Sequence, residues 1–266
     1  MPAANRRPIV GTGWKMNNLA ADAARYASAM QAALSDVDLS VLDIFVLPPF
    51  TALPAAAAAF GDMPVAIGGQ NMHWAESGAW TGEISAAMLK DAGCTYVELA
   101  HAERLKHFGE TYECVRLKVM AALRAGLSPI ICLGESSEDK DLDRADEALS
   151  LQLVTVLSGL APTHLQHIVL AYEPRWAIGV TEAASPSYVA ARHRHLRAVL
   201  AERFGRDAAE TVRIIYGGSV NRDNAMVLAA LPEVDGLFVG RQAWTGEGFA
   251  EIVRIVAAHS PKGDKA

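Results

Sequence analysis

The sequence predicts a closed (β/α)₈ barrel, and three observations support this fold class. Eight short apolar or β-branched runs recur along the chain, and a helix-length amphipathic segment follows each of them. The runs are continuously apolar rather than alternating, which is typical of parallel strands covered by helices. With 266 residues, 51% of them hydrophobic, the chain is long enough for one such domain.

The expected elements can be followed in order along the chain. The strands are PIVGTGW from residue 8, LDIFVLP from 42, VAIGGQN from 65, TYVELAH from 95, SPIICLG from 128, HIVLAYE from 167, VRIIYGG from 212 and VDGLFVG from 234. Segments such as AARYASAMQAAL and AMLKDAG are predicted helices between them. Three prolines break the uncharged run 44–61, which predicts a strand, a turn and a helix start rather than a membrane span. The basic stretch 191–206 is interpreted as the solvated face of an amphipathic helix.

Closure of the sheet is favoured by the number and even spread of the strands. An open doubly wound sheet is the alternative, but GTGWKM has Met16 where the third glycine of a dinucleotide fingerprint belongs. No linker or repeat marks a second domain, so residues 1–266 are expected to form one unit. The tail from about 259 to 266 is expected to fray.

Composition and charge exclude several classes of protein. The formal net charge is −6 and no long basic run occurs, so the sequence does not predict a positively charged surface that could bind nucleic acid. The N-terminal residues lack the features of a signal peptide, and no segment is expected to cross a membrane. Cys94, Cys114 and Cys132 show no CxxC spacing, which indicates buried thiols in a reducing cytoplasm without a disulfide or a metal site.

Polar residues at the predicted strand ends are the candidates for chemistry, because these ends line the active site of such a barrel. Glu173 ends a buried apolar run. Removing a carboxylate from water there costs free energy, and burial raises its basicity, so such a residue is expected only where that basicity has a use in the function. A base without a metal or a nucleophile suggests proton transfer, which needs an electrophile at the substrate oxygen. His101 and Lys15 are candidates for this electrophile. Because Glu103 lies in a predicted first helical turn, His101 is expected at a helix N-terminus. The partial positive charge there disfavours a protonated imidazole, so His101 is expected to stay neutral.

The glycine-containing turns after the seventh and eighth strands indicate a phosphate site. Gly217, Gly218, Ser219 and Gly240 can bring backbone N–H groups close to an anion. The stretch AYEPRWAIGV resembles the stem of a lid, in which Gly179 can add a further N–H group. The alternative for each residue alone is structural: a core histidine, a salt-bridged glutamate or a tight corner.

These motifs resemble the triosephosphate isomerase family across nearly the whole chain. The matching pieces are GWKMN, PPFTALP, GGQNMHWAESGAWTGEIS, ELAHAERLKHFGET, ICLGE, AYEPRWAIG, YGGSVNRDNA and DGLFVG. The resemblance implies a TIM barrel and a cytoplasmic, cofactor-independent isomerase of glycolysis and gluconeogenesis acting on triose phosphates by enediol proton transfer. It further implies the following roles: base for Glu173, neutral electrophile for His101, cation for Lys15, its acidic partner for Glu103, and phosphate binding for Gly179, Ser219 and Gly240.

The resemblance also implies a homodimer. The segment 71–83 is similar to the loop that enters the partner subunit, with Thr81 reaching toward the other active site. Met72, Trp74 and Trp80 would otherwise form an exposed apolar patch, which favours a homodimer on physical grounds as well.

Four positions depart from the family pattern. Gly13 replaces an asparagine, Ala102 a serine, Arg241 the second glycine after strand eight, and Val180-Thr181-Glu182 a Thr-Gly-Lys-like lid end. The Gly13 change opens space near the reacting end of the substrate, enough for a further hydroxymethyl group. Interconversion of the triose phosphates stays the first expectation, and isomerisation of erythrulose 1-phosphate and erythrulose 4-phosphate is the alternative, because GTGWKMN, NMHWAESGAW and GLFVGRQAW resemble that branch.

Two further alternatives belong to other classes. One is a barrel that binds a sugar phosphate without turning it over. The other is an aldolase with a Schiff-base lysine, which the glutamate at the end of strand six argues against. Whether Arg241 meets the phosphate through its guanidinium or its backbone is left open.

Overall fold

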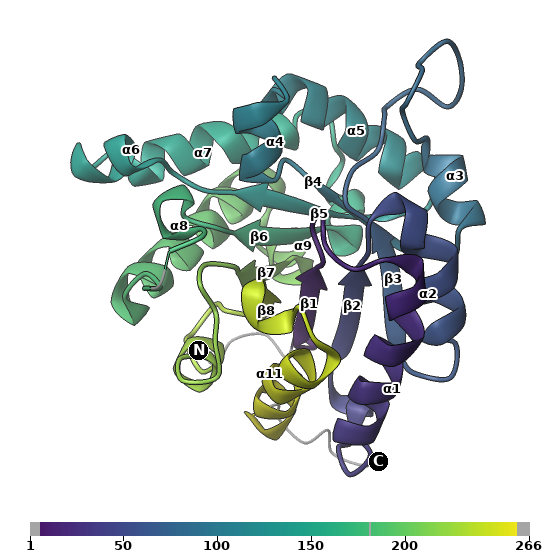
Figure 1. Ribbon diagram of the computed structural model, residues 1–266. Helices are drawn as coiled ribbons and strands as arrows, with labels where there is room; N and C mark the ends of the chain where they lie inside the picture. Colours follow the sequence, from purple (N-terminus) through teal and green to yellow (C-terminus); the bar gives the residue numbers. More distant parts are fainter. Residues whose placement is uncertain (1–5, 181, 260–266) are drawn as a thin grey trace.

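The computed structural model describes residues 6–180 and 182–259, and its centre is a closed barrel of eight parallel strands. The strands pair in chain order from β1 to β8, and β8 pairs back onto β1 (Figure 1). They are β1 Ile9–Gly13, β2 Asp43–Leu47, β3 Val65–Gly69, β4 Tyr96–Leu99, β5 Ser128–Leu133, β6 Val169–Tyr172, β7 Arg213–Tyr216 and β8 Gly236–Val239. Each lies within one of the eight runs expected to be strands. The predicted barrel is confirmed, and the open sheet is excluded.

The continuous apolar runs are explained by burial on both strand faces. Side chains that point inward fill the barrel with large groups such as Phe45 and Phe238, whose ring centroids lie 5.5 Å apart. There is no room inside for a side chain at Gly11, because its Cβ would lie 1.8 Å from the Phe45 ring. The outward side chains join the larger core between the barrel and the helices. The interior is therefore a packed core rather than a pore.

Helices surround this barrel on its outer side (Figure 1). The α-helices are α1 Ala23–Ala33, α2 Leu53–Ala59, α3 Ala86–Asp91, α4 Ala102–His107, α5 Tyr112–Arg124, α6 Ser137–Asp141, α7 Ala145–Val156, α8 Pro186–Phe204, α9 Arg206–Thr211, α10 Ala225–Ala229 and α11 Gly246–His259. Short 3₁₀ turns cover Ala20–Asp22, Leu39–Val41, Phe50–Ala52, Pro162–His167, Arg175–Ala177 and Arg241–Ala243. The first and last α-helices pack against each other and so complete the ring.

Several finer expectations can be compared with this arrangement. The run 44–61 forms β2, a turn and α2 as predicted, and within the described ranges no helix has the length and apolar character needed to cross a membrane. The basic stretch 191–206 is not one helix, because Gly205, with a φ of 88°, separates α8 from α9. It is also not solvated throughout, because His193 and Arg197 are buried. All three cysteines are free, but Cys114 on the outer helix α5 is only half-buried, contrary to expectation. Of the expected frayed tail, His259 ends α11 and residues 260–266 lie outside the described part.

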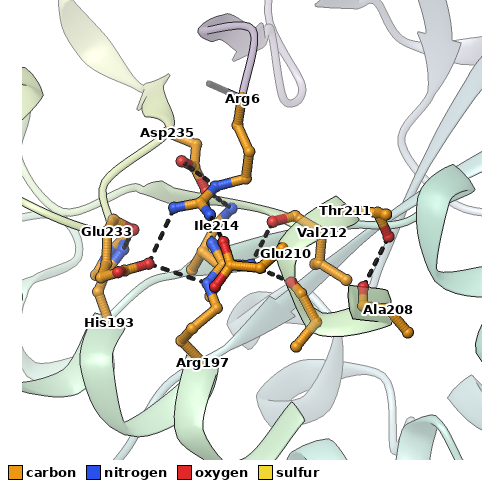
Figure 2. Close-up of polar contacts among 11 residues, drawn as sticks. Arg6, His193, Arg197, Ala208, Glu210, Thr211, Val212, Ile214, Glu233 and Asp235 are labelled. Carbon is orange, nitrogen blue, oxygen red and sulfur yellow. Dashed lines mark hydrogen bonds and ion pairs between the residues drawn. The ribbon is translucent and has the colours of Figure 1, made fainter. Parts of the chain in front are cut away.

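An ion-pair network lies where the chain enters the first and last strands (Figure 2). Arg6, directly before β1, binds Asp235 at 2.7 Å and Glu233 at 2.9 Å. Arg197 of α8 binds the same two carboxylates, at 2.8 and 3.0 Å. Both guanidinium groups are almost fully buried, and Asp235 also accepts the N–H of Ile214 in β7. The network therefore connects β1, β7, β8 and α8, at the opposite ends of the strands from the cavity described next.

Candidate active site

One cavity of about 490 Å³ lies at the carboxyl ends of the strands. It brings together every residue to which the sequence assigned catalysis or phosphate binding: Gly13, Lys15, His101, Glu103, Glu173, Gly179, Gly217, Gly218, Ser219, Gly240 and Arg241. These residues come from five different strand ends that are up to 228 positions apart in the sequence. Trp74 and Thr81 do not line this cavity. Among the described residues, no group of three or more His, Cys, Asp or Glu side chains is arranged to hold a metal ion.

His101 caps the N-terminus of helix α4, which is the position expected for it from the sequence. Its Nδ1 accepts a hydrogen bond of 3.1 Å from the backbone N–H of Glu103, which places the proton of the neutral ring on Nε2. Burial lowers the pKa of His101 to about 4, and the positive charge of Lys15 contributes in the same direction. The imidazole is therefore neutral at physiological pH and directs an N–H group into the cavity, where Nε2 lies 3.6 Å from Glu173 Oε2.

Lys15 lines the same cavity and has a strained backbone conformation, with a φ of 54°. Its ammonium group binds Glu103 at 2.5 Å. Burial opposes the charged form, but the hydrogen bond and attraction to Glu103 outweigh it, so that the pKa of Lys15 is raised. A lysine that forms a Schiff base needs the reverse shift, which argues against the aldolase alternative.

Glu173 directly follows β6, and its carboxyl group is buried. Burial raises the pKa of Glu173 to about 7, an effect that Lys15 partly offsets. Oε2 has no hydrogen-bond partner among the described residues. The family's usual serine hydroxyl near this base is absent, since position 102 is alanine. A carboxylate whose Oε2 is unpartnered among the described residues, and whose pKa is near neutrality, is suited to taking and returning a proton.

The two glycines after β7 are required by close contacts, which differs from the turn geometry considered in the sequence. A Cβ at Gly217 would lie 2.5 Å from Glu173 Oε1, and one at Gly218 would lie 2.4 Å from the Tyr216 hydroxyl. Neither glycine has a positive φ. The absence of side chains at the two glycines therefore makes room for the Glu173 carboxylate and the Tyr216 ring. The N–H group of Gly217, expected to face an anion, instead donates to the carbonyl oxygen of Tyr172 at 2.9 Å.

The base of the expected lid is held by Glu135, which is fully buried after β5. Its carboxylate accepts hydrogen bonds from Trp176 Nε1 at 2.7 Å, Tyr188 at 2.9 Å and Tyr172 at 3.1 Å. The Lys140 ammonium group lies 3.6 Å from the centre of the Trp176 ring. Trp176 is therefore fixed both by packing against the hydrophobic core and by a polar bond to Glu135.

The tip of this loop contacts the glycine-containing turns. Ser219 Oγ lies 2.9 Å from the carbonyl oxygen of Ala177 and 2.7 Å from that of Val180. Arg241 donates from its guanidinium group to the carbonyl oxygen of Gly179 at 3.4 Å. Of the divergent lid end, Thr181 lies outside the described residues. The three segments expected to bind phosphate are therefore already adjacent.

Glu98 and Phe238 also line the cavity, and neither was expected there from the sequence. Glu98 lies inside β4, where the run TYVELAH has one acidic residue among apolar ones. That buried acid was a detectable signal, of the same kind as the one that identified Glu173. Phe238 offered no such signal, because an apolar residue in an apolar strand is ordinary.

The segment expected at a dimer interface extends from the barrel between β3 and α3 (Figure 1). Trp74 is half-buried, Trp80 is 49% exposed and Thr81 is exposed. Met72 was expected in the exposed patch but is fully buried, because it packs into the core between the barrel and the helices. The His73 ring contacts both tryptophans: it is stacked on Trp74 with ring centroids 4.1 Å apart, and tilted against Trp80 with ring centroids 4.2 Å apart.

Comparison with known proteins agrees with this geometry. The sequence model of the family described as triosephosphate isomerase matches residues 8–256. The chain belongs to the triosephosphate isomerase family. A solved triosephosphate isomerase from Bartonella henselae is 33% identical, with a TM-score of 0.83 over 94% of this chain and 98% of that one.

Two relatives in the triosephosphate isomerase family have different names. An L-erythrulose-1-phosphate isomerase from Rhizobium rhizogenes is 46% identical over 96% of this chain and 97% of its own length. A triosephosphate isomerase from Symbiobacterium thermophilum is 43% identical over 95% and 98%. Like its family, the chain is a sugar-phosphate isomerase, and both substrates considered in the sequence analysis occur among the names of its relatives.

Proposed function

We propose that this protein isomerises L-erythrulose 1-phosphate to erythrulose 4-phosphate. The observation that carries the proposal is Gly13, which lines the cavity without a side chain at the place where the family usually has asparagine. A Cβ at this position would meet nothing closer than Glu98 Oε2 at 3.7 Å, an ordinary van der Waals contact, so the missing side chain leaves room without a clash. A four-carbon ketose phosphate has one hydroxymethyl group more than a triose phosphate and needs such space. The name of the Rhizobium rhizogenes relative supports the same substrate.

In the proposed reaction, Glu173 is the base. Its carboxylate takes the proton from C3 of the substrate, the C2 carbonyl becomes an enediolate oxygen, and the proton is returned to C2. The Nε2–H group of His101 donates a hydrogen bond to the developing oxyanion, and the ammonium group of Lys15 stabilises the same charge. Glu103 holds Lys15 in position. Proton exchange between the two substrate oxygens leaves a carbonyl at C3 and a hydroxyl at C2.

The phosphate group is assigned to the cradle formed by Gly179, Gly218, Ser219 and Gly240. Their backbone N–H groups can converge on an anion as the lid closes. The Arg241 guanidinium, now on the Gly179 carbonyl, is close enough to join them. Closure also excludes water, which protects a labile enediol phosphate from losing its phosphate.

The test of this function is the comparison of two substrates with the purified enzyme. We expect kcat/KM for L-erythrulose 1-phosphate to exceed that for dihydroxyacetone phosphate by at least about 100-fold, or about 2.7 kcal/mol in barrier. The reverse preference would establish the triose phosphates as substrates, in line with the Symbiobacterium thermophilum relative and with a place in glycolysis and gluconeogenesis. Binding of both compounds without solvent hydrogen exchange into either would leave only the non-catalytic barrel.

We also propose that the enzyme acts in the cytoplasm as a homodimer through the loop 71–83. An exposed Trp80 beside an exposed Thr81 supports this interface. We expect the wild type to sediment with twice the mass of one chain. Trp80→Glu should shift the sedimenting mass toward that of the monomer, because it would bury a carboxylate in the interface. Leu142→Glu, at an equally exposed apolar position outside this loop, is the matched control and should leave the mass unchanged. A fully active monomeric wild type would contradict the assignment.

A further inference from the structure

Glu98 is a buried carboxyl group at the floor of the cavity, and the roles assigned above do not use it. It comes from β4, is 6% exposed and shares the cavity with Gly13. Its Oε2 lies 3.7 Å from the place where a Gly13 side chain would begin. The space that the missing side chain leaves is therefore bounded by a polar group rather than by an apolar wall.

The hydrogen-bonding capacity of this carboxyl group is largely unused. Among the described residues, its one hydrogen bond comes from the Cys132 thiol, which lies 3.7 Å from Oε1 and is a weak donor. A buried carboxyl group with so little compensation costs stability. The other inner side chains of the packed barrel are mostly apolar. A buried carboxyl group with few partners in such surroundings is typical of a residue that binds a ligand.

The charges around Glu98 decide its protonation state. Burial raises the pKa of Glu98 to about 8, and repulsion by Glu173 acts in the same direction. Lys15 and the Cys132 thiol oppose this shift, while Glu103 adds to it. At neutral pH the group is mostly a carboxylic acid, which can donate one hydrogen bond and accept others. A hydroxyl group has the same pair of capacities and so is a complementary ligand.

We propose that Glu98 and Gly13 form the subsite for the terminal hydroxymethyl group of a four-carbon ketose phosphate, whose hydroxyl is hydrogen-bonded by the Glu98 carboxyl group. The proposal rests on the proposed function and adds the residue that selects the substrate. Gly13 provides the volume, and Glu98 provides the polar contact within it. A triose phosphate has only hydrogen at the corresponding carbon, so it leaves this subsite empty. The substrate preference then comes from a contact that one substrate makes and the other lacks.

The experiment compares Glu98→Leu with Glu98→Gln on L-erythrulose 1-phosphate and dihydroxyacetone phosphate. Leucine fills a similar volume without a polar group, whereas the glutamine amide has the shape of the neutral acid and keeps a donor. We expect Glu98→Leu to lower the ratio of the two kcat/KM values by at least about 100-fold, because the substrate hydroxyl then meets an apolar wall. Glu98→Gln should change this ratio by less than about tenfold.

Thermal unfolding between pH 5 and pH 9 gives a readout that does not depend on turnover. Because the folded-state pKa of about 8 exceeds the ordinary glutamate pKa of 4.5, the folded protein keeps a proton that the unfolded chain releases. The wild type therefore loses stability as pH rises through this window. We expect the Tm of Glu98→Gln, relative to wild type, to increase between pH 5 and pH 8 and then to level off.

The outcomes separate this inference from the proposed function. A wild type that prefers the four-carbon substrate, with a Glu98→Leu variant that loses activity on both substrates equally, would overturn the subsite and leave the function intact. A wild type without activity on L-erythrulose 1-phosphate would overturn both. If Glu98→Leu does not fold, Glu98→Gln still tests the subsite. A loss above about tenfold in the ratio of the two kcat/KM values, or a Tm difference from wild type that is constant with pH, would contradict a protonated Glu98 that binds the substrate hydroxyl.

Discussion

Glu173→Gln is expected to lower kcat by about 10²- to 10⁴-fold, the range that a positioned general base contributes. Glutamine has nearly the same shape but cannot accept the proton from carbon. Binding of inorganic phosphate, measured as inhibition of the residual activity or as protection against unfolding, should change little because the base does not belong to the phosphate cradle. Glu202→Gln, an exposed charge change on α8, is the matched control and should retain wild-type kcat.

The same variant is expected to be more stable than the wild type at neutral pH. The folded-state pKa of Glu173 is about 7 and exceeds the ordinary glutamate pKa of 4.5, so ionisation of this group costs stability. The cost is absent below pH 4.5 and complete above pH 7, and the Tm difference between variant and wild type should grow across this window. In wild-type kinetics, kcat/KM should fall below pH 7 as Glu173 gains a proton, while His101, with a pKa of about 4, stays neutral.

Equal losses of turnover and of phosphate binding in Glu173→Gln would contradict the assigned role. They would indicate that the carboxylate organises the whole site rather than moving a proton. A Tm difference that does not change with pH would contradict the raised pKa.

Gly217→Ala is the second substitution with a large expected effect. The new Cβ would lie 2.5 Å from Glu173 Oε1 and 2.9 Å from its Cγ, so the side chain must move. A displacement of about 1 Å at a reacting group can cost about 100-fold in rate. We expect kcat to fall by this order, with the affinity for inorganic phosphate and the fold retained, since the clash is with one side chain.

The matched control for this variant is Gly61→Ala, after helix α2. Gly61 has no positive φ, and a Cβ there would meet nothing closer than a backbone oxygen at 3.4 Å. It should leave kcat within about twofold of wild type. Wild-type turnover in Gly217→Ala would show that Glu173 does not need its observed position.

Much of the fold could be predicted because its signal is local. A parallel strand buried on both faces must be apolar throughout, and each of the eight runs showed this pattern. The break at Gly205 was missed for a different reason: the helical pattern continues across it, and a positive φ at one residue cannot be seen in hydrophobic periodicity. Met72 was placed wrongly because its burial depends on which direction the loop takes after β3.

By itself, the sequence determined the barrel, the end of the barrel that carries the chemistry, and the candidate residues Lys15, His101 and Glu173, because these depend on strand order and residue type. Only the tertiary structure decided their relations. It showed that Gly217 leaves room for Glu173, that Glu135 fixes the lid, and that Glu98 faces the gap at Gly13. The physical reason is that distances and burial arise when strands far apart in the chain close into a ring. Hydrogen bonding and pKa depend on those distances rather than on neighbours in sequence.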